Sequence, residues 1–529
     1  MKPPLRISNT LSKKKEVFSP LNPPKVLFYS CGPTVYGPLH IGNARALLFA
    51  DFFYKLLKHL KYDVQFVRNY TDVDDKIIER AKQENISALD VAQKYIDYCE
   101  KDIALLGLAK PSKTARVTES IQDIIQLIQK IIENGHAYIV DGEVLFSVHA
   151  FTGYGKLSGK HIDDLQAGAR VEIDTKKKNP LDFALWKPYT GDPHWDSPWG
   201  KGRPGWHIEC SAMVGRYLGM TIDIHHGGQD LIFPHHENEI AQSESATGKT
   251  FCNYWLHHAF LNMKTEKMSK SLGNILTIRE FIEKYGAELL RFLYISHHFR
   301  SPVEYSPTLL KQSLDELERV YILKKWAKEN LDLEMTASKK SSEHLHVERA
   351  TRELGDACVS NVLDAGATRE FGDASVSNAL GVGKRVSGAN MNATKSDEVF
   401  QKMEEDLLND LNSPGALGHL FTWVREINRN KDITHATDFY NFLNNKIFPI
   451  FNVFGDDPET ALAQIQKNRK SLSTIQTTFS EEQIQSLINE RTSARKNKDF
   501  KRADEIRKQL DEQGIEITDS PTSTAWQYK

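Results

Sequence analysis

Residues 25–67 read KVLFYSCGPTVYGPLHIGNARALLFADFFYKLLKHLKYDVQFV, which is the pattern of a strand, a helix and a second strand. The apolar run Lys25–Ser30 leads into a Gly-Pro turn at Cys31, as a buried strand does. Apolar residues then recur at helical spacing over 48–60, and Tyr62–Val67 is again strand-like. Because parallel strands need a crossover such as this helix, the segment predicts a parallel sheet.

The α/β pattern continues on both sides of a segment with a different character. Thr221–His225 and Trp255–Phe260 read as further strands, and Glu237–Ala246 reads as a helix. The predicted fold class is α/β: a Rossmann-like parallel-sheet catalytic domain with an inserted domain, followed by a helical region. The predicted parts are 1–110 and 206–306 for the two halves of the sheet domain, 111–205 for the inserted connective domain, 307–465 for a helical bundle and 466–529 for a C-terminal tail.

The composition is that of a globular protein with several domains. The 529 residues carry a formal net charge of −2, so any nucleic-acid surface has to be a local patch. No apolar run approaches the ~20 residues of a membrane helix, and the polar N-terminus lacks the core of a secretory signal. We therefore expect no membrane partner and a cytoplasmic location. The five cysteines are widely spaced, which argues against a disulfide framework.

An internal repeat interrupts the predicted helical bundle. Thr351–Leu363 reads TRELGDACVSNVL and Thr368–Leu380 reads TREFGDASVSNAL, at an offset of 17 residues. Two copies are too few for a solenoid. The surrounding residues 335–396 are rich in Ala, Gly, Ser and Asn, which predicts a flexible insertion, with a separate interaction element as the alternative.

The motif HIGN, residues 40–43, stands where the turn after the first strand enters the predicted helix. A helix N-terminus presents unpaired N–H groups and the positive end of a dipole, so it suits phosphate oxygens. Gly42 allows a nucleotide to approach the backbone closely, while His40 and Asn43 can hydrogen-bond to it. Taken alone, the motif fits a core-packing histidine equally well.

A second motif, KMSKS at residues 267–271, places two lysines three residues apart in a loop. Lys267 and Lys270 can hold a triphosphate and offset the charge that develops when pyrophosphate leaves. Together the two motifs, in this order, resemble the signatures of class I aminoacyl-tRNA synthetases. In that family the first motif ends in histidine, where this chain has Asn43.

Longer stretches resemble the cysteinyl-tRNA synthetase family within class I. The stretches that carry the resemblance are Tyr29–Tyr36, Asn69–Lys76, Gly205–Met213, Asp230–Gln242 and Arg491–Gly514. The resemblance covers roughly residues 5–320 and the C-terminal end, whereas 335–396 take no part in it. It implies a ligase that activates cysteine with ATP as cysteinyl-adenylate and transfers the cysteinyl group to the 3′ end of tRNA(Cys).

Two cysteines, a histidine and a glutamate are candidate metal ligands. His235 and Glu239 are four residues apart, so they share one helix face and suit a single metal ion. Cys31 and Cys210 are distant in sequence, and spacing alone leaves separate buried cysteines and a surface histidine pair as an open alternative. The family resemblance implies that all four are ligands of one zinc ion.

The resemblance also implies that Trp206 and His225 lie near the amino-acid pocket. Zinc in such a pocket would separate cysteine from serine, because a thiolate binds zinc well and a neutral hydroxyl does not. Four protein ligands are typical of a closed structural zinc, so a purely structural ion is the competing interpretation. The expected cofactors and partners are thus one Zn²⁺ per chain, cysteine, tRNA(Cys) and ATP with Mg²⁺, and the expected state is a monomer.

The C-terminal tail carries a local excess of positive charge. Residues 491–509 hold eight Lys and Arg against three acids, an excess of +5, within a predicted helical hairpin over 479–510. A solvated helix face is one interpretation, and a surface that contacts a polyanion is the other. With the family resemblance, the tail 466–529 is expected to bind the anticodon region of tRNA.

Three other functions fit parts of the same sequence. A ligase that joins cysteine to an amino-sugar would resemble the catalytic half, but it needs no basic tail. A zinc hydrolase built on His225, His226, His235, His236 and Glu237 is the second. It lacks both the H-E-x-x-H and the H-x-x-E-H patterns and leaves KMSKS unexplained. A non-catalytic RNA-binding protein has no need of the two nucleotide motifs.

Overall fold

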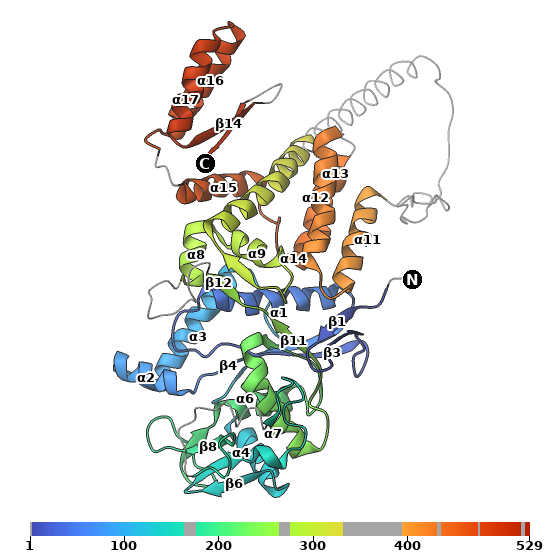
Figure 1. Cartoon of the computed structure of the whole chain (residues 1–529), viewed down its shortest axis with the longest axis vertical. Coiled ribbons are helices and arrows are strands. Elements are labelled where there is room, and N and C mark those ends of the chain that lie inside the picture. Colours follow the sequence, from blue (N-terminus) through green and yellow to red (C-terminus); the bar gives the residue numbers. More distant parts are fainter. Residues whose placement is uncertain are drawn as a thin grey trace, which may run out of the picture.

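The computed structural model describes residues 3–162, 176–263, 276–331, 394–430, 435–473, 477–519 and 524–528. A parallel sheet lies in the middle of the molecule, with the inserted domain at one end of the long axis and the C-terminal domain at the other (Figure 1). Within the described ranges, no helix has both the length and the apolar character needed to cross a membrane.

A five-stranded parallel sheet forms the centre of the first domain, in the order β11-β10-β3-β4-β5. Its strands are β3 (Lys25–Ser30), β4 (Asp63–Tyr70), β5 (Lys113–Arg116), β10 (Ile222–Gly228) and β11 (Cys252–His258). The predicted βαβ unit is confirmed, because α1 (Ile41–His59) connects β3 to its parallel neighbour β4. The strand order reverses around β3, and ligands bind at the carboxyl ends of strands at such a point.

Helices cover both faces of the sheet, because successive strand residues point to opposite sides. Phe28 and Phe66 belong to the core formed with α1 and α3, whereas Tyr29 and Val67 belong to the core formed with α6 and α7. The elements on these two faces are α2 (Asp75–Glu84), α3 (Ala88–Leu105), α6 (Trp206–Tyr217), η2 (Gln229–Leu231), η3 (Ile232–His236) and α7 (Glu237–Thr247).

The inserted domain is a four-stranded antiparallel sheet, ordered β6-β7-β8-β9, with one long helix. Its elements are α4 (Ile121–Glu133), β6 (Ala137–Val140), β7 (Glu143–Phe146), η1 (Val148–Ala150), β8 (Phe183–Pro188) and β9 (Gly202–Pro204). β5 lies inside the predicted range 111–205, yet it pairs with β4 as the edge strand of the parallel sheet. Its four residues, KTAR, have no apolar run, because an edge strand can remain polar.

Short elements complete the first domain. They are β1 (Arg6–Asn9), β2 (Lys14–Val17), β12 (Leu261–Met263), β13 (Val303–Tyr305), α8 (Ile278–Tyr285) and α9 (Ala287–Ile295). Buried Asp223 on β10 fixes the N-terminal segment to the sheet, since its carboxylate accepts from the backbone N–H groups of Leu21 at 2.6 Å and Leu27 at 2.7 Å.

The helical region follows as predicted and adds one helix that was not predicted. It comprises a helix over 307–331, α11 (Lys395–Leu408), α12 (Ser413–Asn430), α13 (Ala436–Phe442), η6 (Leu443–Ile447), α14 (Phe448–Phe451) and α15 (Pro458–Leu472). Most of the repeat-bearing insertion lies outside the described residues. Its predicted end at 396 is two residues too late, because Thr394 caps α11 and accepts the backbone N–H of Asp397 at 3.2 Å.

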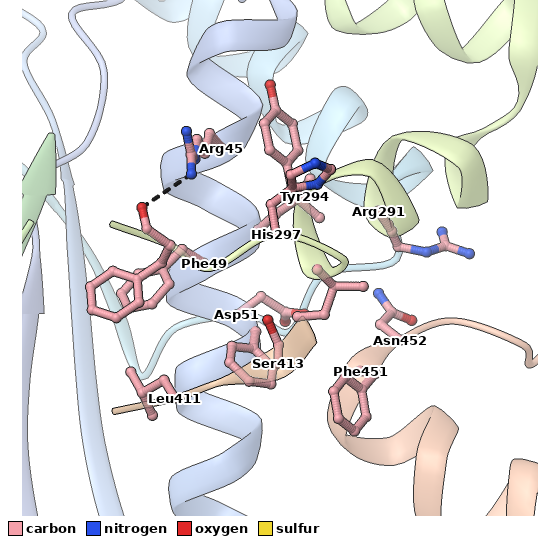
Figure 2. A pocket seen from close by; sticks show the side chains of 14 residues that line it. Arg45, Phe49, Asp51, Arg291, Tyr294, His297, Leu411, Ser413, Phe451 and Asn452 are labelled. Carbon is pink, nitrogen blue, oxygen red and sulfur yellow. Dashed lines mark hydrogen bonds between the residues drawn. The ribbon is translucent and has the colours of Figure 1, made fainter. Parts of the chain in front are cut away.

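A small pocket marks the contact between the sheet domain and the helical region (Figure 2). It is lined by α1, α9 and the segments around Leu411 and Phe451. Arg45 at one side is 3% exposed and donates to the carbonyl oxygens of Phe260 at 2.6 Å and Phe299 at 3.1 Å. This side chain therefore fixes the start of α1 to the chain that follows β11.

The C-terminal domain is a helical hairpin followed by a strand hairpin. Its elements are α16 (Glu481–Lys496), α17 (Phe500–Glu512), β14 (Ile515–Asp519) and β15 (Thr524–Tyr528). The helical hairpin was predicted and the strand hairpin was not. The domain has a core of its own, made by Ile484, Ile488, Ile506, Leu510, Ile515 and Tyr528.

Candidate functional site

The carboxyl ends of β3 and β10 bring two distant cysteines together. Cys31 follows β3 directly, and its backbone N–H donates to the carbonyl oxygen of His226 on β10 at 2.9 Å. Cys210 lies in the second turn of α6, which begins at Trp206 and packs against the same sheet. The two sulfur atoms are 3.9 Å apart, far beyond the ~2.05 Å of a disulfide bond.

The other two candidate ligands come from one helical segment. His235 is the fourth residue of the π-helical turn η3, and Glu239 lies in the first turn of α7. The predicted sharing of one helix face is confirmed by the distance of 3.1 Å between His235 Nε2 and Glu239 Oε1. His207 approaches His235 Nδ1 at 3.0 Å, which fixes the orientation of the ring and leaves Nε2 for the cluster.

The four predicted ligands form one compact cluster. One ligand atom from each of Cys31, Cys210, His235 and Glu239 lies within 4.8 Å of all the others, and all four residues are buried. Cys31 Sγ is 3.9 Å from Glu239 Oε1. The tertiary structure thus joins residues from three separate parts of the sequence in the geometry of a metal site.

The electrostatics of the cluster favour anionic donors. Burial, followed by the hydrogen bond with Cys210, raises the pKa of Cys31. The hydrogen bond from the Cys31 thiol lowers the pKa of Cys210 to about 6. Burial acts to raise the pKa of Glu239, but His225 and His235 outweigh it and lower that pKa to about 2. A thiolate at Cys210 and a carboxylate at Glu239 are the donors that a divalent cation requires.

A second set of ligand atoms shares two members of the cluster. Cys31, His225, His236 and Glu239 also have ligand atoms within 4.8 Å of one another. His225, expected near the amino-acid pocket, is fully buried, and its Nε2 lies 2.8 Å from Glu239 Oε2. His236 was not predicted. The sequence feature that accompanies His236 is the glycine at position 227. A Cβ at Gly227 would come within 2.5 Å of the His236 ring, so the ring packs where a larger residue would clash.

Trp206 is a partly exposed aromatic residue that packs against the cluster. Its ring stacks on His235 with a centroid distance of 4.5 Å and an interplanar angle of 27°. The side chain is 41% exposed although it adjoins buried residues. Trp206, expected near the amino-acid pocket, thus contacts a candidate metal ligand with its ring and reaches the protein surface.

The HIGN motif begins α1 as predicted. His40 is the N-cap: the Asn43 backbone N–H donates to His40 Nδ1 at 3.3 Å, and Asn43 Oδ1 accepts the His40 backbone N–H at 3.1 Å. Asn43, where the family signature has histidine, therefore has a capping contact. Lys267 and Lys270 lie outside the described residues. The chain that follows them is described, and it pairs with the motif through Ile41 N–H to Leu276 O at 3.0 Å.

The arrangement does not suit the zinc hydrolase considered above. Glu237, the residue that would have to act as its base, is fully buried and accepts the backbone N–H groups of Leu157 at 3.3 Å and Ser158 at 2.8 Å. This carboxylate holds the inserted domain against α7.

Comparisons with known proteins cover nearly the whole chain. Residues 17–315 match the profile described as tRNA synthetases class I (C) catalytic domain. The chain is 44% identical to the cysteine–tRNA ligase of Geobacter metallireducens, with 99% of this chain and 100% of that protein covered. The chain belongs to the cysteine–tRNA ligase family. The corresponding enzyme of Geobacter sulfurreducens is 42% identical over the same shares.

Membership of the cysteine–tRNA ligase family makes the chain a class I aminoacyl-tRNA synthetase, an enzyme of the ligase class. Residues 402–455 match the DALR domain, and residues 480–526 match the domain described as Cysteinyl-tRNA ligase anticodon binding domain. The predicted fold class and family are thereby confirmed.

Two solved synthetases share the fold at low sequence identity. Methionyl-tRNA synthetase of Mycobacterium tuberculosis, in complex with methionyl-adenylate, is 15% identical with a TM-score of 0.52, covering 83% of this chain and 93% of that one. The LeuRS of Agrobacterium radiobacter K84, in a ternary complex with tRNA and LeuAMS, is 10% identical with a TM-score of 0.54, covering 95% of each chain.

Proposed function

We propose that this chain activates cysteine with ATP and then transfers the cysteinyl group to the 3′ end of tRNA(Cys). The observation that carries the proposal is the cluster of Cys31, Cys210, His235 and Glu239 at the carboxyl end of the central strand. A cytoplasmic location and a monomeric state remain predictions.

The donor set of the cluster fits zinc. Two sulfurs, one imidazole nitrogen and one carboxylate oxygen are ligand types that zinc accepts, and calcium or magnesium would require oxygen donors instead. Glu239 keeps one oxygen for a metal, since its other oxygen is engaged by His225 at 2.8 Å. When bound, zinc would supply a Lewis acid that takes a substrate thiolate and not a neutral hydroxyl. This supports zinc as the selector of cysteine.

The remaining parts of the site support the reaction with ATP. The amino-acid carboxylate would attack the α-phosphorus, forming a C–O–P bond while the bond to pyrophosphate breaks. The α1 N-terminus offers the positive end of the helix dipole to phosphate oxygens. The described chain that follows KMSKS lies beside the same helix end, because Ile278 N–H donates to Leu39 O at 2.9 Å. This supports a role for Lys267 and Lys270 at the phosphates. In the second step the terminal hydroxyl of tRNA attacks the acyl carbon and AMP leaves.

Cysteine-dependent exchange of pyrophosphate into ATP tests the first step, and charging of tRNA(Cys) tests the second. Exchange without serine-dependent activity, followed by charging, is the expected result. Exchange followed by transfer to an amino-sugar but not to tRNA would support the small-molecule ligase instead. Zinc-loaded protein without any exchange would support a structural zinc and contradict the proposal.

Replacing Lys270 by alanine is expected to slow cysteine-dependent exchange by about 100-fold, the size of one lost contact to developing charge. The affinity for cysteine should change little, because the metal cluster is untouched. Lys284→Ala, an exposed lysine on α8, serves as the matched control and should leave the rate unchanged. An unaltered exchange rate in Lys270→Ala would remove the role assigned to that lysine.

Residues 335–392 are expected to be dispensable for both steps. A short Gly/Ser linker in their place should leave charging within about threefold of the parent, provided that Thr394 remains to cap α11. The alternative, a tRNA contact through Lys384, Arg385 and Lys395, is weakened because Lys395 pairs with Glu426 at 3.6 Å. Loss of charging with exchange intact would favour that alternative.

A further inference from the structure

One buried carboxylate beside the metal cluster has no role so far. Glu209 lies on α6, one residue before Cys210, and is 1% exposed. Its Oε2 has no hydrogen-bond partner, and no described lysine or arginine forms an ion pair with it. A buried carboxylate oxygen without a partner costs free energy, and such an atom calls for an explanation.

A chain of polar contacts connects Glu209 to the loop that carries Cys31. The Gly32 backbone N–H donates to Asn69 Oδ1 at 2.8 Å, and Asn69 Nδ2 donates to Thr71 Oγ1 at 3.5 Å. The Thr71 side chain is close enough to the Glu209 carboxylate to favour its ionised form. The Glu209 side chain therefore lies between α6 and the segment that follows β4, beside Cys210.

The acidic neighbours of Glu209 disfavour its ionised carboxylate unless a cation lies beside it. Asp72 and Asp74 both lie close enough to interact unfavourably with it. Asp72 is already satisfied, because its two oxygens accept the backbone N–H of Thr118 at 3.1 Å and its hydroxyl at 2.6 Å. Glu209 is the carboxylate of this group whose oxygen lacks a donor.

We propose that Glu209 binds the α-ammonium group of the amino-acid substrate. The inference rests on the proposed function, in which the substrate thiolate is held at Cys31 and Cys210. Three bonds separate the sulfur and the nitrogen of cysteine, so the ammonium must lie within one side chain's reach of the metal cluster. Glu209, adjacent to Cys210 on the helix, supplies an oxygen there that has no other partner.

The test compares two thiols that differ in the ammonium group. Cysteine carries it, and 3-mercaptopropionate has the same thiol and carboxylate without it. Both are titrated by calorimetry into zinc-loaded wild-type protein and Glu209→Gln. We expect wild-type protein to bind cysteine at least about tenfold more tightly than 3-mercaptopropionate, the strength of a hydrogen bond to a charged group. In Glu209→Gln, cysteine affinity should fall about 10- to 100-fold while 3-mercaptopropionate affinity stays within about twofold.

Two further measurements separate binding from structure. Zinc content should remain one ion per chain in Glu209→Gln, and its melting temperature should equal or exceed that of wild type, because a buried carboxyl group with an unpartnered oxygen has been removed. Asp72→Asn alters the neighbouring carboxylate that Thr118 already satisfies, so it should leave the ratio of the two affinities unchanged.

Several outcomes would overturn the inference. They are equal binding of the two thiols by wild-type protein, an equal loss for both in Glu209→Gln, and unchanged cysteine affinity in that variant. The wild-type comparison stands even if the variant does not fold. A wild-type protein that catalyses cysteine-dependent exchange but shows any of these results would retain the proposed function and lose the ammonium site.

Discussion

Cys210→Ser is expected to lose zinc and cysteine activation together. The variant should contain well under one zinc ion per chain by elemental analysis, and cysteine-dependent exchange should fall at least about 1,000-fold. The physical reason is that a neutral hydroxyl replaces a thiolate donor, and even outer partners of metal ligands account for about 10- to 100-fold. Cys210 is 2% exposed and its pKa is lowered to about 6, so its sulfur is a buried thiolate donor that serine does not replace.

Cys99→Ser is the matched control for this prediction. Cys99 is equally buried, at 1% exposed, but it lies on α3 against the Tyr70 hydroxyl. Its replacement should leave one zinc ion per chain and nearly unchanged exchange. Full zinc content in active Cys210→Ser would contradict the assignment of the ligand, and equal losses in both variants would indicate general destabilisation.

Removal of residues 477–529 is expected to reduce tRNA charging about 1,000-fold while cysteine-dependent exchange stays within about twofold. The C-terminal domain has its own core, so the cut removes one folded unit and leaves the sheet domain complete. Three charge-assisted contacts to tRNA, at about 1.5 kcal/mol each, already correspond to this loss. Steady-state charging and exchange rates of the same preparation measure the two effects. Equal charging by the truncated enzyme would count decisively against a tRNA-binding tail.

The structure indicates which basic residues of 491–509 are available to contact tRNA. Several of the basic residues are neutralised, for example Arg491 and Arg495 by Asp519 at 2.7 Å, and Arg502 by Glu490 at 2.8 Å. Among the eight Lys and Arg of 491–509, all of them described, those without an ion pair are Lys496, Lys498, Lys501 and Arg507. Lys498 and Lys501 flank Phe500 in the sequence, and Phe500 is 62% exposed at the start of α17.

An exposed aromatic ring between unpaired cations is typical of a surface that stacks an unpaired base and contacts phosphates. In the full-length chain, Phe500→Ala should therefore reproduce part of the loss of tRNA charging, at about 1–3 kcal/mol in tRNA affinity. Arg502→Ala, whose cation is already paired, is the matched control and should have a much smaller effect. A smaller effect of Phe500→Ala than of Arg502→Ala would place the tRNA contact elsewhere.

Local periodicity predicted the fold where a helix buries a continuous apolar stripe. The helix over Ile121–Glu133 has the predicted ends, because isoleucines at helical spacing fill the core beneath it. Local periodicity failed to predict strands that are largely polar and are stabilised by hydrogen bonds to a neighbouring strand. β14 and β15 stabilise each other across a hairpin, and β5 is held by β4. α15 was missed although Asp457 followed by Pro458 is a readable helix start.

The sequence by itself determined the chemistry of the site: which side chains can donate to a metal, and which motifs can bind phosphates. It also predicted that His235 and Glu239 share one helix face, since four residues make about one helical turn. Spacing alone left Cys31 and Cys210 apart, and only the tertiary structure places them beside this pair, because α6 packs against the sheet where β3 ends. It alone revealed that Glu209 lacks a partner, since burial and hydrogen bonding depend on neighbours that are remote in the chain.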